Sequence, residues 1–169
     1  MKINIALENG LLPDRYGKHA TGADLYAAHP ITSFPFTIED APADAKTFAL
    51  LLIDFDAVPV SGFPWIHWTA ANISAAQTTL PENASRSGEI ALINGRNSNA
   101  GHLVNNPDDK IKIGYVGPQP PDKVHDYTLI VFALDTALPL TTGFWFNELR
   151  HAMQGHILAT ATRDIPSRN

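Results

Sequence analysis

The run TFALLLIDFDAV, residues 47–58, decides the fold because it leads a buried strand into two aspartates. Its first part, TFALLLIDF (47–55), is a continuous apolar run, which is typical of a strand covered on both faces. Asp54 and Asp56 stand two residues apart, so on a strand both carboxylates would point the same way. A carboxylate beside buried strands is costly unless a partner compensates its charge. The stretch therefore predicts a central strand that ends in a polar site.

Length, composition and charge narrow the class of protein. The chain has 169 residues, of which 44% are hydrophobic, and shows no break in composition, so we expect one globular domain over residues 1–169. Its net charge of -5 comes without long acidic or basic runs and gives no support to a nucleic-acid partner or an anionic membrane surface. No apolar stretch approaches the ~20 residues that span a bilayer, so we expect no integral membrane contact.

The chain contains no cysteine, which excludes disulfides, thiol catalysis and cysteine-ligated metals. Its first residues, MKINIALENG, do not form a signal-peptide pattern, because polar residues soon interrupt their apolar patch. We therefore expect a cytoplasmic protein.

Further segments complete the expected sheet. WIHWTAANI (65–73) predicts a second strand with both faces covered, and the segment 110–135 predicts a strand, a Gly/Pro loop and another buried strand, YTLIVFAL. The residues before 47 are broken by prolines and glycines and predict short strands and loops. The segment 74–109 predicts a long irregular excursion in which only EIALI has strand character.

The segment TGFWFNELRHAMQGHILATATRDI (142–165) is predicted to form the one clear helix of the chain. Phe146, Leu149, Met153 and Ile157 recur there at helical spacing and form an apolar stripe that would cover a sheet. Several strand-like runs followed by a helix predict an α+β domain, mostly β, built on an antiparallel sheet. The stretch GYVGPQPP lacks the lysine and the Ser/Thr of a phosphate-binding P-loop.

Polar or ionisable residues interrupt these buried segments at four places. They are Asp54 with Asp56, His67, the loop GPQPP (117–121), and His125 with Tyr127. At the start of a strand, the sequence HDY places His125 and Tyr127 on one face and Asp126 on the other. If the strands are neighbours, these groups converge on one site.

Each interruption taken alone also has a structural interpretation. A buried histidine such as His67 is often satisfied by a backbone carbonyl, and aspartates after a strand often bond their own backbone in a turn. The loop GPQPP could be only a rigid turn, and Tyr127 could be a core residue with its hydroxyl at the rim. Their occurrence together favours a functional site.

The chemistry of this set favours binding. Histidines and aspartates can ligate a divalent metal, but the usual spacing of metal ligands is absent. No nucleophile elbow supports hydrolysis, and the two neighbouring aspartates do not suit a glycosidase. Imidazole, hydroxyl and backbone N–H groups can instead donate to a small oxyanion, while the aspartates orient the histidines or meet a cation. A phosphate ester that carries an ammonium group would suit both charges.

A series of motifs runs through most of the chain, from Phe48 to Ala161: LLLIDFDAV, PWIHWTAANI, GRNS, GYVGPQPP, HDYTLIVFALD and AMQGHILATA. In this order they resemble the signatures of the phosphatidylethanolamine-binding protein family, most closely its bacterial branch of Raf-kinase-inhibitor-like proteins. The resemblance implies a large central antiparallel sheet, a smaller second sheet on one side, and helices including a C-terminal one on the other. It also implies a small pocket that accepts phosphate-like groups and the phosphorylethanolamine head group.

Carried over position by position, the resemblance implies these ligand-binding residues: Asp54, Asp56, Trp65, His67, Gly117, Gln119, Pro120, His125 and Tyr127. It implies no catalytic residue, metal ligand or cofactor. The family has prolines where this chain has Phe55 and Val58, so we expect a less rigid loop and a differently shaped mouth. It has arginine where this chain has Asp126, which alternation turns away from the pocket.

The leading hypothesis is therefore a non-enzymatic protein that binds a small anionic or zwitterionic phosphoryl ligand, such as phosphate or a phosphorylethanolamine head group. The alternative is a regulatory protein that inhibits a partner, a kinase or a protease, through the pocket rim. A hydrolase that uses water activated by the His/Asp cluster is a third hypothesis. The resemblance also makes a homodimer plausible.

Overall fold

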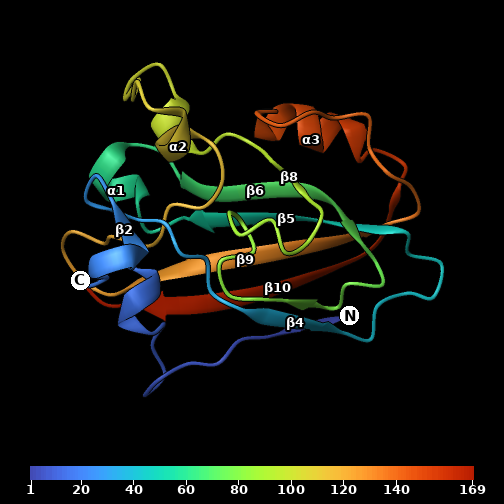
Figure 1. Cartoon of the computed structure of the whole chain (residues 1–169), viewed down its shortest axis with the longest axis horizontal. Coiled ribbons are helices and arrows are strands. Elements are labelled where there is room, and N and C mark those ends of the chain that lie inside the picture. Colours follow the sequence, from blue (N-terminus) through green and yellow to red (C-terminus); the bar gives the residue numbers. More distant parts are fainter.

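The computed structural model describes residues 1–169 and centres on a five-stranded antiparallel sheet (Figure 1). Its strands, in spatial order, are β10 (Ile157–Ser167), β9 (His125–Leu134), β5 (Thr47–Asp54), β6 (Trp65–Ser74) and β8 (Ile93–Asn94). The three longest apolar runs of the sequence form β5, β6 and β9, as predicted. β5 lies between the other two, which is the position expected for a strand that is apolar on both faces.

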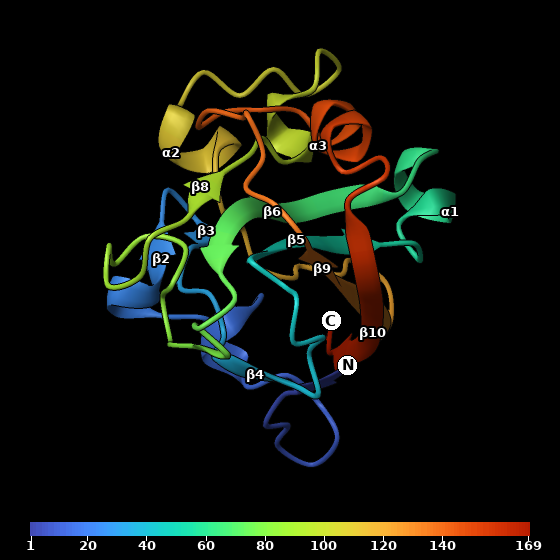
Figure 2. The same cartoon turned by 90° about the vertical axis from the view of Figure 1, so that its right-hand side faces the viewer.

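A smaller sheet packs against one face of the central sheet, and the longest helix lies over the other face (Figure 2). The smaller sheet contains β1 (Lys2–Asn4), β4 (Phe36–Glu39) and β7 (Thr79–Leu80), and the helix is α3 (Phe146–Ala152). The predicted architecture, α+β and mostly β with two sheets and a helix near the C-terminal end, is confirmed.

Short elements occupy the connections. They are the β2 (Leu25–Tyr26) and β3 (His29–Pro30) ribbon, α1 (Val58–Ser61), α2 (Asp109–Lys112), and the 3-10 turns η1 (Asp14–Tyr16), η2 (Gly22–Asp24) and η3 (Ser98–Ala100). No helix has the length and apolar character needed to cross a membrane. Residues 74–109 are largely irregular, as predicted, although only Ile93 of EIALI belongs to a strand.

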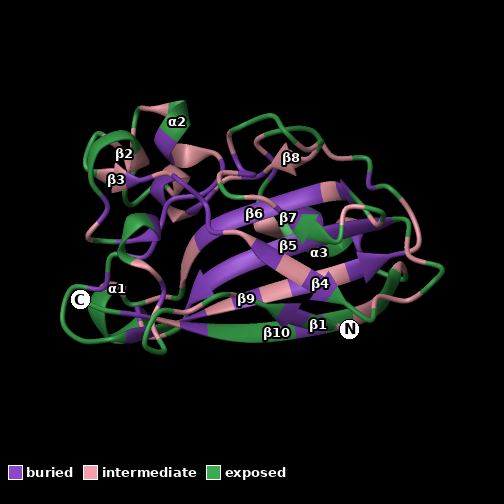
Figure 3. Ribbon diagram, turned by 60° about the horizontal axis from the view of Figure 1, so that its bottom comes forward, coloured by how far each residue is buried: buried purple, intermediate pink, exposed green.

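Two hydrophobic clusters fill the space on either side of the central sheet. The larger cluster lies toward the smaller sheet and includes Leu50 and Leu52 of β5. The other lies under α3 and includes Ala49 of β5 together with Leu149. Because successive residues of β5 face opposite clusters, every residue of this strand is buried (Figure 3). This two-sided burial explains the apolar run and leaves polar groups to the end of the strand.

The prediction of a strand at the start of the segment 110–135 is wrong, because Asp109–Lys112 form the single helical turn α2. The side chain of Asp108 accepts a hydrogen bond from the backbone N–H of Lys110 at 2.8 Å, which caps this turn. Only Ile113 forms an isolated bridge, with Arg96. The local cap therefore outweighs the alternating pattern that favoured a strand.

The helix predicted over 142–165 is confirmed only over Phe146–Ala152, and the prediction is wrong from Ile157 onward, where the chain forms the strand β10. Gly155 has a φ of +80°, in the left-handed region that turns the chain. Ile157 then begins β10, which pairs with β9 at the edge of the sheet, and its side chain is 45% exposed. The spacing of four residues after Met153 predicted that Ile157 lies on the helix. Gly155, which stands between these two residues, instead turns the chain away from the helix direction.

Replacing Leu52 by alanine should lower the free energy of unfolding by about 2–5 kcal/mol, because the leucine is completely buried between the two sheets. The matched change Leu158→Ala on the edge strand, where the side chain is 41% exposed, should cost less than ~1 kcal/mol. Urea unfolding followed by circular dichroism measures both. Equal losses would contradict the layered packing.

Candidate functional site

The ends of three neighbouring strands meet at one edge of the central sheet. Asp54, the last residue of β5, is paired in register with Trp65 at the start of β6 and with Tyr127 near the start of β9. This arrangement follows because β5 runs antiparallel to both neighbours, so its end lies beside their beginnings. The polar interruptions of the three strands are therefore brought together.

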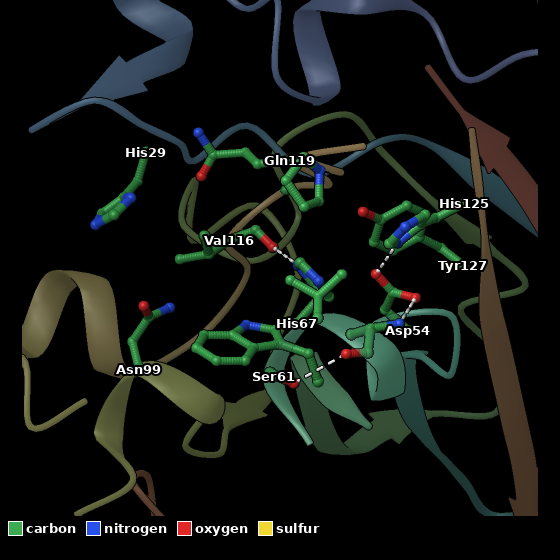
Figure 4. A pocket seen from close by; sticks show the side chains of 14 residues that line it. His29, Asp54, Ser61, His67, Asn99, Val116, Gln119, His125 and Tyr127 are labelled. Carbon is green, nitrogen blue, oxygen red and sulfur yellow. Dashed lines mark hydrogen bonds and ion pairs between the residues drawn. The ribbon is translucent and has the colours of Figure 1, made fainter. Parts of the chain in front are cut away.

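A cavity of about 230 Å³ lies at this edge (Figure 4). It is smaller than the ~300–1,000 Å³ typical of sites for drug-sized ligands, and it suits a small anion or a head group. Its lining includes most of the residues that the sequence singled out: Asp54, Trp65, His67, Gly117, Gln119, His125 and Tyr127. Asp56 and Pro120 are not part of this lining.

His67 is oriented by the loop that crosses the cavity. Its Nδ1 lies 2.7 Å from the carbonyl oxygen of Val116. A carbonyl can only accept, so Nδ1 carries a proton, and in the neutral ring Nε2 has only a lone pair. Burial lowers the pKa of His67 and favours this neutral form. His67 must therefore gain a proton on Nε2 before it can donate to an anion.

The loop that orients His67 is fixed at Gly117. A Cβ at this position would collide with the backbone carbonyl of Tyr16. The N–H of Gly117 donates to the carbonyl of Pro30 at 2.8 Å, and the N–H of Val116 donates to the carbonyl of His67 at 3.1 Å. The close approach requires glycine and holds the loop between the N-terminal segment and β6.

His125 lies between two carboxylates. Its Nδ1 is 2.8 Å from Oδ2 of Asp54, and its Nε2 is 2.9 Å from Oδ1 of Asp122. Burial alone would lower the pKa of His125, but its hydrogen bonds to Asp54 and Asp122 outweigh burial and raise that pKa. The protonated ring compensates the buried charge of Asp54.

The two aspartates after β5 have different partners. Oδ1 of Asp54 accepts from the backbone N–H of Ala57 at 3.0 Å, while Oδ2 faces His125. Oδ2 of Asp56 accepts from the backbone N–H of Asp126 at 3.0 Å. The strand ends at Asp54, so the shared orientation expected from strand alternation is not observed. Asp56 instead fixes the beginning of β9.

Tyr127 adds a buried hydroxyl to the cavity. Burial raises the pKa of Tyr127, and the nearby charge of Asp54 raises it further. The hydroxyl therefore keeps its proton at neutral pH and can act as a donor. Its ring meets the ring of His67 edge-on, with centroids 5.0 Å apart. No three His, Asp or Glu side chains converge in a way that could hold a metal ion.

Comparison with known proteins agrees with the motifs. The family model for phosphatidylethanolamine-binding protein matches residues 3–165. The chain belongs to the phosphatidylethanolamine-binding protein family. The Bacillus subtilis protein YxkA is 47% identical over 167 residues, covering 98% of this chain and 99% of that protein. A UPF0098 protein of Chlamydia muridarum is 38% identical over 130 residues, covering 75% of this chain and 76% of that protein.

Two solved structures share the fold over nearly the whole chain. A Chlamydia trachomatis protein described as a phosphatidylethanolamine-binding protein homologue, CT736, gives a TM-score of 0.78 at 28% identity and covers 99% of this chain and 97% of its own. Escherichia coli YbcL, described as a member of the mammalian family, gives 0.75 at 26% identity, covering 99% and 98%. The expected family, its bacterial branch and its fold are confirmed.

Three positions at which this chain departs from the family motif lie on the surface of the protein. Phe55 is 51% exposed and Val58 is 43% exposed. Asp126 is also exposed and points away from the neighbouring His125 and Tyr127, which are buried, as alternation predicts. The three substitutions therefore change the surface near the site rather than its lining.

Sequence reasoning missed part of the lining: His29, Ala57, Val60, Ser61, Asn99 and Val116. His29 and Asn99 lie at the end of the cavity away from Asp54 and His125 (Figure 4). Nδ1 of His29 is buried without a hydrogen-bond partner. Nothing in the local sequence marks His29, because only the tertiary fold brings β3 to the cavity. Asp122 was also missed, although it stands three residues before His125.

Replacing Asp54 by asparagine should lower the pKa of His125, because Nδ1 loses a charged partner. A histidine whose pKa is raised on folding contributes stability that is complete below its unfolded value, about 6.5, and is lost as pH rises through the folded value. Asp54→Asn should thus be more destabilising at low pH than at high pH. NMR titration of the His125 ring and urea unfolding measure the two effects.

The control for this change is Asp126→Asn, which removes the same charge from an exposed side chain on the same strand. It should leave the pKa of His125 almost unchanged. A His125 pKa that stays the same in Asp54→Asn would show that the contact does not form in solution.

Proposed function

We propose that this protein binds a small anionic or zwitterionic phosphoryl ligand, phosphate or a phosphorylethanolamine-like head group, without chemical turnover. The observation that carries the proposal is that His67 and Tyr127, two potential donors, line a cavity of head-group size. Their rings meet edge-on with centroids 5.0 Å apart, which places the two side chains next to each other in the cavity. Membership of the phosphatidylethanolamine-binding protein family supports this assignment.

The donors available to an anion depend on protonation. No lysine or arginine lines the cavity. His67 donates through Nε2 only when it is protonated, whereas Tyr127 keeps its hydroxyl proton because its pKa is raised by burial. A phosphoryl group would therefore be bound by one neutral donor and one donor that its own charge helps to protonate.

The acidic side of the cavity favours a ligand that also carries a cation. Asp54 lines the cavity beside His125, and a positively charged ligand group would reduce the cost of its burial. In this proposal Asp54 acts through His125 and through its charge. Asp56 and Pro120 do not contact the ligand. Asp56 serves by holding the backbone of Asp126, next to His125.

Affinity for phosphate and for O-phosphorylethanolamine should rise as pH falls between about 8 and 5, because a bound anion favours the protonated form of His67. Burial lowers the pKa of His67 in the free protein, and a bound anion would raise that pKa in the complex. Affinity should therefore decline as pH rises through the pKa of the free protein, and it should level off above the higher pKa of the complex. Isothermal titration across this range measures the effect.

The ligand itself also titrates here, since a phosphate ester has a second pKa of about 6. The variant His67→Ala separates the two contributions and should lose about tenfold or more in affinity. His151→Ala removes an exposed histidine of α3 and should bind like the native protein. Flat native affinity over the range, or undiminished binding by His67→Ala, would count against the proposal.

A second candidate is a protein that inhibits a kinase or protease through the pocket rim. The observation in its favour is a set of exposed apolar side chains near the mouth, Phe55 and Val60, each 51% exposed. Val60 also belongs to the lining. Such side chains can mark a partner surface. The change Phe55→Ser, at a residue outside the lining, should weaken inhibition of a defined kinase or protease while ligand binding persists.

Three further parts of the proposal are absence of turnover, a cytoplasmic location and a homodimer, of which the first and the last are suggested by the family resemblance. Hydrolysis of generic phosphate or acyl esters that disappears in His67→Ala would replace the binding proposal by the hydrolase hypothesis. Sedimentation equilibrium of the purified chain decides between monomer and dimer.

A further inference from the structure

Arg86 is a partly buried cation that has no carboxylate in contact with it. It stands in the irregular segment 74–109 and forms no ion pair. Its Nη2 lies 2.7, 3.4 and 2.9 Å from the backbone carbonyl oxygens of Lys110, Ile113 and Tyr115. Burial lowers the pKa of Arg86, because the charged form loses water. One end of the guanidinium therefore holds the chain around α2, while its charge has no direct counterion.

Three of the five N–H groups of this guanidinium have no acceptor in the protein. A guanidinium carries one N–H on Nε and two on each Nη. Nε is buried without a hydrogen-bond partner. Nη1 also makes no hydrogen bond, but unlike Nε it is not buried. Because unpaired donors inside a protein are costly, the structural role of Nη2 does not account for the rest of the group.

Arg86 lines a second cavity, of about 530 Å³, on the side of the molecule where α2, β8 and β2 lie together (Figure 2). This volume falls within the ~300–1,000 Å³ typical of small-molecule sites. Segments far apart in the chain contribute to the lining, among them Tyr26, Asn94 and Lys110. The second cavity shares no lining residue with the cavity beside Asp54, so the two are separate sites.

A second cation lies at this cavity. Lys110 belongs to the lining and, like Arg86, forms no ion pair. Its Nζ lies 4.9 Å from the centroid of the Tyr26 ring, a cation–π distance. The aromatic ring therefore holds the ammonium group beside the cavity without neutralising its charge.

The carboxylates nearby are bonded to other groups. Asp109 lines the cavity, but its Oδ1 is paired with Nζ of Lys112 at 2.9 Å. Oδ2 of Asp108 accepts from the hydroxyl of Tyr26 at 2.7 Å. The charge of Asp108 raises the pKa of Arg86 against the effect of burial, although the two groups form no ion pair. The three basic side chains at the second cavity exceed the two carboxylates by one positive charge.

We propose that the second cavity binds a small organic oxyanion, a carboxylate or a phosphate monoester, through Arg86 and Lys110. The oxyanion accepts from Nη1 of Arg86 and from Nζ of Lys110, and it supplies the counterion that the guanidinium does not have. The apolar part of the ligand lies against Ile31 and Ile113, which also belong to the lining. This function goes beyond the phosphoryl-ligand proposal and does not depend on it.

NMR titration of ¹⁵N-labelled protein at neutral pH tests the site with benzoate, phenyl phosphate and the uncharged benzamide. At least one of the two anions should shift the Nε–H signal of Arg86 and the amide signal of Lys110 in a saturable way. Benzamide should bind there at least about threefold more weakly, because it has no charge. Signals of His67 report on the other cavity separately. Failure of both anions to shift the Arg86 signals, or equal binding of benzamide, would overturn the proposal.

Two variants test the cations. Lys110→Gln, at an exposed side chain, should weaken binding of the anion by about threefold. Arg86→Lys keeps the charge but not the planar donors and should weaken binding by about tenfold. The control Lys2→Gln changes an exposed lysine of β1, far from α2 in Figures 1 and 2, and should bind like the native protein.

The amide spectrum of each variant verifies that it is folded. If Arg86→Lys does not fold, Lys110→Gln decides alone. Unchanged binding by Lys110→Gln, or an equal loss in Lys2→Gln, would overturn the proposal. Because the titration resolves the two cavities, either can fail to bind while the other does.

Discussion

The buried contact between Asp54 and His125 is the constraint on which the site depends. The two residues are 3% and 1% exposed, and a carboxylate left alone in such a position would be strongly disfavoured. The contact joins the end of β5 to the beginning of β9 at a point where backbone pairing also joins them. Removing either partner would leave the other buried and uncompensated. The same contact therefore aligns two strands of the sheet and sets the charge of the cavity.

One connecting segment, between α2 and β9, controls both histidines of the site. Its Val116 carbonyl fixes the tautomer of His67, and its Asp122 carboxylate bonds the ring of His125. Gly117 and the prolines that follow limit the conformations open to this segment. The two histidines are on different strands, and the sheet brings their side chains close together. The connecting segment then fixes the orientation of their rings.

The sequence predicted the parts of the fold that depend on long apolar runs. β5, β6 and β9 are each ten residues or shorter, and their burial pattern leaves little ambiguity about their state. The errors came where one residue controls the chain locally: the cap at Asp108 and the left-handed Gly155. His29 could not be found, because only contacts between distant segments bring it to the cavity. The different orientations of Asp54 and Asp56 depend on where the strand ends, which periodicity does not resolve.

No lysine or arginine lines the cavity, so in the proposed function no permanent cation attracts the ligand. An arginine would bind many phosphoryl compounds through strong charge-assisted hydrogen bonds. Here His67 becomes a charged donor only when a ligand or a low pH protonates it, and the carboxylate of Asp54 is compensated by His125. In the proposed function, a ligand that brings its own cation would reduce the cost of burying Asp54, so the aspartate that first seemed out of place beside buried strands would favour a zwitterionic ligand.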